Sequence, residues 1–224
     1  VAKCKDMSKE EQDAYVQKLT SENEMPRAFE FKTFDKIKEE SNDKDKKYNK
    51  LRKESSIKKE ILYVTAQEHA VPSSMLAMIK YIKAEKNDYE QLITVNSGNI
   101  KESEERLKRY NLGDIQIITR DDEKYLKSLS EAEYIFSDCG LEYYFAAKNN
   151  QKYFNLQTDN ISAKMTRKKE RECFEFATVQ KSIITPKASI YLTNESRLSF
   201  EKAYRCEMLP TSAIISDCPA FDMA

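Results

Sequence analysis

Glycine is scarce in this sequence, at 3 of 224 residues, whereas roughly 7% of an average chain is glycine. Glycine-rich loops that cradle phosphate groups are therefore disfavoured, and so are turn-dense all-β folds. The segment QEHAVPSS follows the first predicted strand, where a dinucleotide-binding fingerprint would stand, and it contains no glycine. We therefore expect no nicotinamide or flavin, and no other cofactor.

Histidine and paired cysteines are also lacking. His69 is the one histidine of the sequence, which excludes metal sites that need two histidines. The five cysteines lie far apart and form no C-x-x-C pair. Neither a disulfide framework nor a zinc site fits that pattern, so we expect reduced thiols and no metal.

The sequence has no excess of either charge and no long apolar run. Its 38 basic residues are balanced by 38 acidic ones, so no overall field attracts nucleic acid, and we expect no nucleic-acid partner. No segment approaches the roughly 18 apolar residues of a membrane span. The first residues, VAKCKDMSKEEQ, also lack the apolar core of a secretory signal. We expect a cytoplasmic protein, and whether the chain is a segment of a longer one stays open.

Residues 1–59 are rich in Lys, Glu, Asp and Asn, and their few apolar residues recur at intervals of three and four. That spacing predicts short amphipathic helices, so we interpret residues 1–59 as a polar helical segment or linker. The residue composition changes near Lys59, from mostly polar to alternating apolar runs, and we place a domain boundary there.

Residues 60–224 alternate between β-rich runs and amphipathic stretches. The predicted strands are residues 61–65, 91–96, 115–119, 133–138, 152–157, 189–194 and 212–216. The predicted helices lie between them, over residues 72–86, 100–111, 121–130, 141–148, 167–181 and 195–204. Strand and helix alternating at this spacing indicate a mostly parallel sheet with right-handed crossovers. The strands are continuous apolar runs, as expected for a sheet with helices on both faces. The sequence therefore predicts a Rossmann-like α/β domain.

Polar residues follow the predicted strands, at the carboxyl edge where open parallel sheets bind their ligands. We select as substrate-binding candidates Gln67, Glu68, His69, Asp138, Gln157, Thr158 and Asp159. Arg120 also stands at a strand exit. His69 can serve as a general base or bind phosphate, but a loop histidine is also a common helix cap or surface residue. We assign no catalytic residue.

The segment KMTRKKERE, residues 164–172, places basic residues at the start of a predicted helix, where cations oppose the helix dipole. Lys164, Arg167, Lys168 and Lys169 are therefore candidates for contact with substrate phosphate or with anionic lipid headgroups. The alternative is a solvated helix end, which the interspersed acids favour.

The order of pieces in the carboxy-terminal two thirds carries a family resemblance. The run EAEYIFSDCGLEYYFAAKNNQKYFNLQTDNISAKM precedes a predicted helix, then ASIYLTNESRLSFEKAY, then IISDCPAFD. This arrangement resembles the amino-terminal half of the CDP-glycerol glycerophosphotransferase family, which builds teichoic-acid-type polymers, over roughly residues 60–222. The matching positions are Asn155, Lys164, Met165, Thr193, Asn194, Pro219 and Asp222.

The resemblance implies one half of a GT-B-type architecture, the acceptor-side half, with a second Rossmann-like domain in the longer parent chain. It also implies a lipid-linked or polymer acceptor at the inner face of the membrane, with weak peripheral membrane contact, and it adds Asp222 to the substrate-binding candidates. The family's catalytic histidine falls on Thr158, and the closing turn lacks its glycine and arginine. We therefore expect a domain that is incomplete or inactive alone. Two alternatives stay open: a non-catalytic partner- or polymer-binding module, and a different sugar-nucleotide transferase that uses His69.

Overall fold

The computed structural model describes residues 31–66, 70–85, 88–157, 180–182, 184–204, 206 and 212–217. The chain separates into two compact units, residues 1–46 and 47–224. The predicted division into residues 1–59 and 60–224 stays a prediction. Everything below concerns the second unit.

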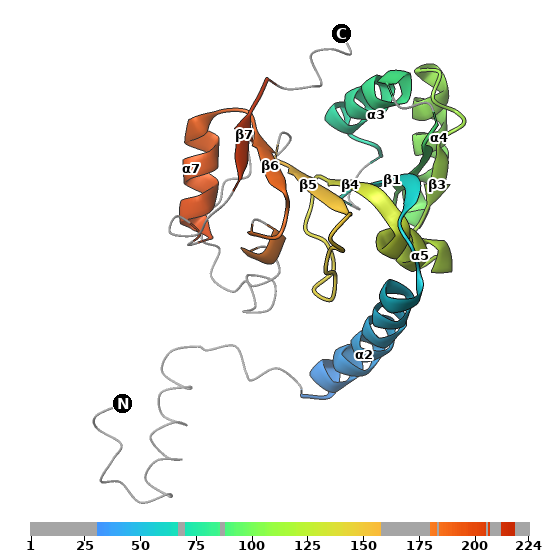
Figure 1. Ribbon diagram of the computed structural model, residues 1–224, viewed down its shortest axis with the longest axis vertical. Helices are drawn as coiled ribbons and strands as arrows, with labels where there is room; N and C mark the ends of the chain where they lie inside the picture. Colours follow the sequence, from blue (N-terminus) through green and yellow to red (C-terminus); the bar gives the residue numbers. More distant parts are fainter. Residues whose placement is uncertain are drawn as a thin grey trace, which may run out of the picture. The chain divides into compact units, whose positions relative to one another are not determined.

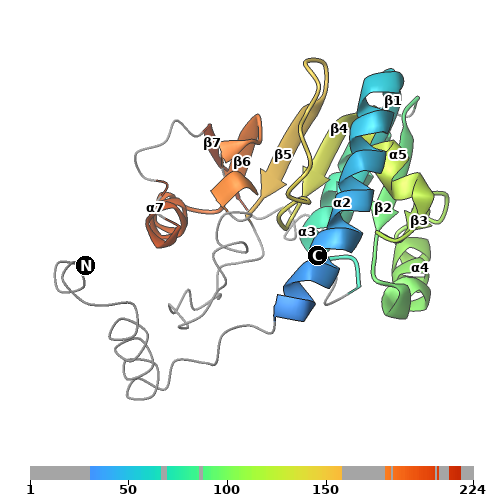
Figure 2. The same ribbon diagram turned by 90° about the horizontal axis from the view of Figure 1, so that it is seen from below.

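Seven parallel strands form one sheet in the order β3-β2-β1-β4-β5-β6-β7 (Figures 1 and 2). The strands are β1 Lys58–Val64, β2 Glu90–Thr94, β3 Gln116–Ile118, β4 Ala132–Ser137, β5 Lys152–Leu156, β6 Ala188–Tyr191 and β7 Ala213–Ile215. Each neighbouring pair is parallel. The predicted Rossmann-like α/β sheet is confirmed, and all seven predicted strands are present.

Helices cover both faces of the sheet, as predicted. The described helices are α2 Phe31–Glu54, α3 Ser73–Glu85, α4 Ile100–Arg109, α5 Glu123–Glu131 and α7 Asn194–Ala203, with a short 3₁₀ helix, η2, at Ser97–Asn99. On one face, Met75 and Ile79 of α3 and Leu107 of α4 pack with Ile61 and Tyr63 of β1. On the other face, residues of α5 and the last part of α2 form a second apolar cluster with β1, β4 and β5. Because alternate residues of β1 enter each cluster, its whole run from Glu60 to Val64 is buried.

The prediction of a helix over residues 141–148 is wrong. Cationic side chains from other elements occupy carbonyl groups that a helix would use internally. The carbonyl of Tyr143 accepts from Lys181 Nζ at 2.5 Å, and the carbonyl of Ala146 accepts from Arg52 Nε at 2.8 Å. The segment is amphipathic, but these tertiary hydrogen bonds override its local helix propensity.

The last part of α2 takes the place of the missing crossover helix between β4 and β5. Tyr48 is fully buried in the second apolar cluster, and Leu51 packs against it. The Tyr48 ring lies 6.3 Å from that of Phe145, and its hydroxyl donates to the carbonyl of Ala146 at 3.2 Å. Residues 47–54 therefore belong to the core of the sheet domain.

Replacing Tyr48 by alanine should destabilise the domain by about 3–5 kcal/mol, because a large buried side chain leaves a cavity between α2 and the β4–β5 segment. Tyr81 is 68% exposed on α3, so Tyr81→Ala is a matched control that should change stability by no more than about 0.5 kcal/mol. Urea unfolding of both variants measures the difference. Equal stability of the two variants would show that the end of α2 is not part of the core.

Candidate functional site

The strand order reverses between β1 and β4, since β2 and β3 extend the sheet on one side and β5 to β7 on the other. In open α/β sheets, ligands bind at this switch point, beyond the carboxyl ends of the strands. The candidate site is therefore built from the segments that leave β1, β3 and β4, together with the neighbouring exit of β5.

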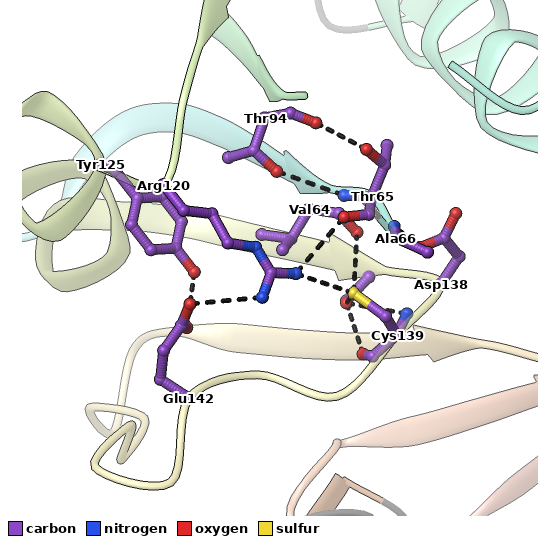
Figure 3. Close-up of polar contacts among 10 residues, drawn as sticks. Val64, Thr65, Ala66, Thr94, Arg120, Tyr125, Asp138, Cys139 and Glu142 are labelled. Carbon is purple, nitrogen blue, oxygen red and sulfur yellow. Dashed lines mark hydrogen bonds and ion pairs between the residues drawn. The ribbon is translucent and has the colours of Figure 1, made fainter. Parts of the chain in front are cut away.

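Asp138, a predicted site residue, follows β4 directly and is buried. Its Oδ1 accepts a hydrogen bond from the backbone N–H of Ala66 at 2.7 Å, and its own N–H donates to the carbonyl of Val64 at 3.2 Å (Figure 3). Both bonds connect the exit of β4 to the exit of β1. The Asp138 carboxylate thus holds the two sides of the switch point together.

Gln157 follows β5 at the same edge of the sheet and is also buried. Its backbone N–H donates to the carbonyl of Ile190 at 2.8 Å, which extends the pairing of β5 with β6 by one residue. Asp138 and Gln157 therefore leave adjacent parallel strands on the same side.

The other predicted site residues lie outside the described residues. They are Gln67, Glu68, His69, Thr158, Asp159, Lys164, Arg167, Lys168, Lys169 and Asp222.

Arg120 is the centre of a polar cluster at the switch point (Figure 3). One terminal nitrogen lies 2.9 Å from Cys139 Sγ and donates to the carbonyl of Thr65 at 3.3 Å. The other lies 3.5 Å from Glu142 Oε1. The guanidinium therefore joins the exits of β1, β3 and β4. Its Nε is buried and has no hydrogen-bond partner within the described ranges.

The cluster continues to Tyr125 of α5, whose hydroxyl donates to Glu142 Oε2 at 2.5 Å. Burial is the main cause that raises the pKa of Tyr125 well above its usual range, and the negative charge of Glu142 is the next largest cause. Burial likewise raises the pKa of the Cys139 thiol to about 11, although the Arg120 cation opposes that shift. Cys139 is thus a protonated thiol at neutral pH and not a nucleophile. Burial alone would lower the pKa of Arg120, but its neighbours outweigh burial and raise it, so the cation persists.

Two threonines fix the exits of β1 and β2 to each other. The N–H of Thr65 donates to Thr94 Oγ1 at 3.2 Å, and Thr65 Oγ1 donates to the Thr94 carbonyl at 2.6 Å (Figure 3). Together with Arg120 and Asp138, they make the described rim a set of groups bonded to one another. Such a network holds the described exits of β1 to β4 in fixed positions relative to one another.

Sequence reasoning placed Arg120 at a strand exit but missed Cys139, Glu142 and Tyr125. Cys139 could have been found, since it directly follows Asp138. Glu142 was assigned to the helix that does not form, and Tyr125 lies inside α5. In the described part of the chain, histidine, cysteine, aspartate and glutamate side chains form no group of three or more suited to a metal ion. Among the described helices, none combines the length and apolar character needed to cross a membrane.

No family model matches the sequence, and no curated protein matches it either. Solved structures of the wall teichoic acid polymerase TagF do match the fold. TagF itself gives a TM-score of 0.56 at 16% identity over 86% of this chain and 48% of TagF. A histidine-to-alanine variant gives 0.56 at 16% identity, over 84% and 46% of the two chains. A variant soaked with CDPG gives 0.57 at 15% identity, over 86% and 49%.

The chain spans about half the length of the TagF structures it resembles. The likeness shows the fold: a parallel α/β sheet with flanking helices, similar to one half of TagF and GT-B-like. The expected half of a GT-B-type architecture is confirmed at that level.

Replacing Arg120 by methionine should destabilise the domain by about 3 kcal/mol, because Glu142 would be left as a largely buried, uncompensated charge. Adding Glu142→Gln to Arg120→Met should restore part of that loss. Arg109 is exposed on α4, so Arg109→Met is the matched control and should stay within about 0.5 kcal/mol of the original protein. Urea unfolding compares them. An Arg120→Met variant as stable as the control would refute the structural role of the cluster.

Proposed function

We propose that this domain is the acceptor-side half of a CDP-glycerol glycerophosphotransferase-like enzyme of the GT-B type, linked to synthesis of teichoic acid or another bacterial surface polymer. The observation that carries the proposal is the likeness of its fold to one half of TagF, over 84% of this chain. The order of motifs over residues 60–222, which resembles the same family, supports the proposal.

The geometry of the rim supports an acceptor-binding role. Asp138 and Gln157 leave adjacent strands on one edge, and the rigid rim around Arg120 fixes the start of each loop. A second Rossmann-like domain would supply the nucleotide site, because GT-B enzymes bind donor and acceptor in a cleft between two domains. The acceptor would be a lipid-linked or polymeric chain of glycerol phosphate.

The proposed reaction needs a base and a cation. In this sequence the positions of the family's catalytic histidine and of the arginine in its closing turn hold other residues. An acceptor hydroxyl oxygen attacks the β-phosphorus of CDP-glycerol, its proton passes to a base, and the bond between phosphorus and the CMP oxygen breaks. Thr158 stands where the family has histidine, and its hydroxyl cannot accept a proton near neutral pH. We therefore propose that the domain alone binds acceptor but does not catalyse transfer.

A non-catalytic partner- or polymer-binding module is the second candidate. One observation favours it: the Asp138 and Glu142 carboxylates and the terminal nitrogens of Arg120 already contact protein groups in the described rim. Such contacts stabilise the fold without a substrate.

The purified chain should release no CMP from CDP-glycerol above background, with or without a short glycerol phosphate oligomer as acceptor. It should bind that oligomer in isothermal titration calorimetry, and a neutral glucose oligomer of the same length should not bind. CMP release by the chain alone would show that the catalytic machinery is complete. Absence of oligomer binding would reject the acceptor-side role.

Weak, salt-sensitive contact with anionic membranes is the final element of the proposed function. Changing Arg167, Lys168 and Lys169 to Ala should weaken binding to anionic vesicles by about 100-fold, since each basic residue near the surface contributes about 1 kcal/mol. The matched control changes three exposed basic residues of α4, Lys101, Lys108 and Arg109. Co-sedimentation at low and high salt measures both. Equal loss by the two triple variants, or no binding by the original protein, would remove the 164–172 segment as a membrane contact.

A further inference from the structure

Three buried polar side chains share one face of β5 and β6. Asn155 of β5 is fully buried, and Ser189 and Tyr191 of β6 are each 1% exposed. Asn155 and Ser189 are partners in the strand register. Tyr191 lies two residues beyond Ser189, so its side chain is on the same face of the sheet. The three side chains are thus neighbours in the interior.

Among the residues that the structure describes, each of these side chains has a polar atom without a hydrogen-bond partner. The atoms are Asn155 Oδ1, Ser189 Oγ and Tyr191 Oη. The orientation of the Asn155 amide is fixed, because its Nδ2 donates to the carbonyl of Ser182 at 2.8 Å. A flipped amide would place two oxygens together there. The large majority of buried side-chain polar atoms in proteins have a partner, so three exceptions on neighbouring residues indicate a bound molecule that would pair with them.

The chemistry of the three atoms defines the kind of molecule. Asn155 Oδ1 accepts a hydrogen bond, whereas the two hydroxyl groups can each donate and accept. Burial, followed by the Glu201 carboxylate, raises the pKa of Tyr191 to about 12, so its hydroxyl stays protonated. The Ser189 hydroxyl lies near the Tyr191 hydroxyl and lowers its pKa through a side-chain hydrogen-bond interaction, but this contact is too poor in distance or angle to satisfy either buried hydroxyl.

The charge near the three atoms disfavours an anion. Glu201 affects Tyr191 more strongly than Arg197 does, and the Glu201 carboxylate itself lies 3.8 Å from Arg197. A phosphate group would meet a carboxylate and no uncompensated cation among these described neighbours. A small neutral molecule with a hydroxyl group can instead donate to Asn155 and pair with both hydroxyls.

We propose that Asn155, Ser189 and Tyr191 form a buried binding site for a small uncharged hydroxylic molecule, either water or glycerol. The bound hydroxyl completes three hydrogen bonds, the usual number for an ordered buried water. It connects β5 to β6 two residues before Gln157, where β5 reaches the rim. This site does not depend on the proposed function.

Nuclear magnetic resonance of the full chain, with the side-chain amide of Asn155 as the probe, tests the site. If water occupies it, magnetisation passes from a long-lived water to the Asn155 Nδ2 protons, and added glycerol changes nothing. If glycerol occupies it, those protons shift saturably as glycerol is added. The proposal would be overturned if neither magnetisation transfer nor a saturable shift were observed.

Tyr191→Phe provides the companion variant, because it removes one hydroxyl and keeps the ring. We expect it to abolish the signal and to lower Tm by about 2–4 °C, the shift for one lost hydrogen bond in a domain of this size. The control is Tyr63→Phe, since Tyr63 is also fully buried but donates directly to Gln91 at 3.0 Å. It should lower Tm and leave the signal intact. A Tyr191→Phe variant that keeps the signal, or that raises Tm, would contradict the assignment.

Discussion

Burial of both faces of the central strand β1 is the constraint on which the rest of the domain depends. Every residue from Glu60 to Val64 is removed from water, so each face needs its own apolar layer. On one face α3 and α4 provide it directly from the crossovers of β1 and β2. On the other face α5 and the end of α2 form the layer together, the latter through Tyr48. The polar rim follows from this arrangement, because only tightly held strands can bring Thr65, Arg120 and Asp138 within hydrogen-bonding distance of neighbouring exits.

The two polar regions of the domain differ in how their hydrogen bonds are completed. At the β1–β4 switch point, carboxylate, guanidinium, hydroxyl and amide groups bond to one another, and Arg120 Nε is the exception. On β5 and β6, three neighbouring side chains each have a polar atom without such a partner among the described residues. The domain therefore combines a rigid support for the rim loops with a place where a small molecule is part of the structure. The rim and the β5–β6 site belong to parallel strands of one sheet, which end at the same edge.

The strands could be predicted from the sequence because their signal is local. A continuous apolar run such as ILYVT predicts a buried strand without information from distant residues. Helix α3 was equally clear, since Ser73 follows Pro72 at a helix start. The segment LEYYFAAK has the right periodicity for a helix, but Arg52 and Lys181 reach its carbonyl groups from distant parts of the sequence, and no local pattern reports that. The site was predictable only as a set of strand exits. The pairing of Arg120 with Cys139 and Glu142 depends on two loops meeting, which the strand order decides. The likeness to TagF appears in the fold at 16% identity, whereas no family model matches the sequence.

The contact between Tyr48 and Ala146 spans 98 residues of sequence. During translation, the apolar side of residues 47–54 leaves the ribosome long before the segment that covers it. At the usual rate of synthesis, 98 residues take about 5–20 s. Strands β1 to β4 are complete in that interval, but the face of the sheet that Tyr48 closes must wait for the β4–β5 segment. The nascent chain therefore carries an exposed apolar surface for seconds, and it is in that period that chaperone binding or a wrong association between chains would compete with folding.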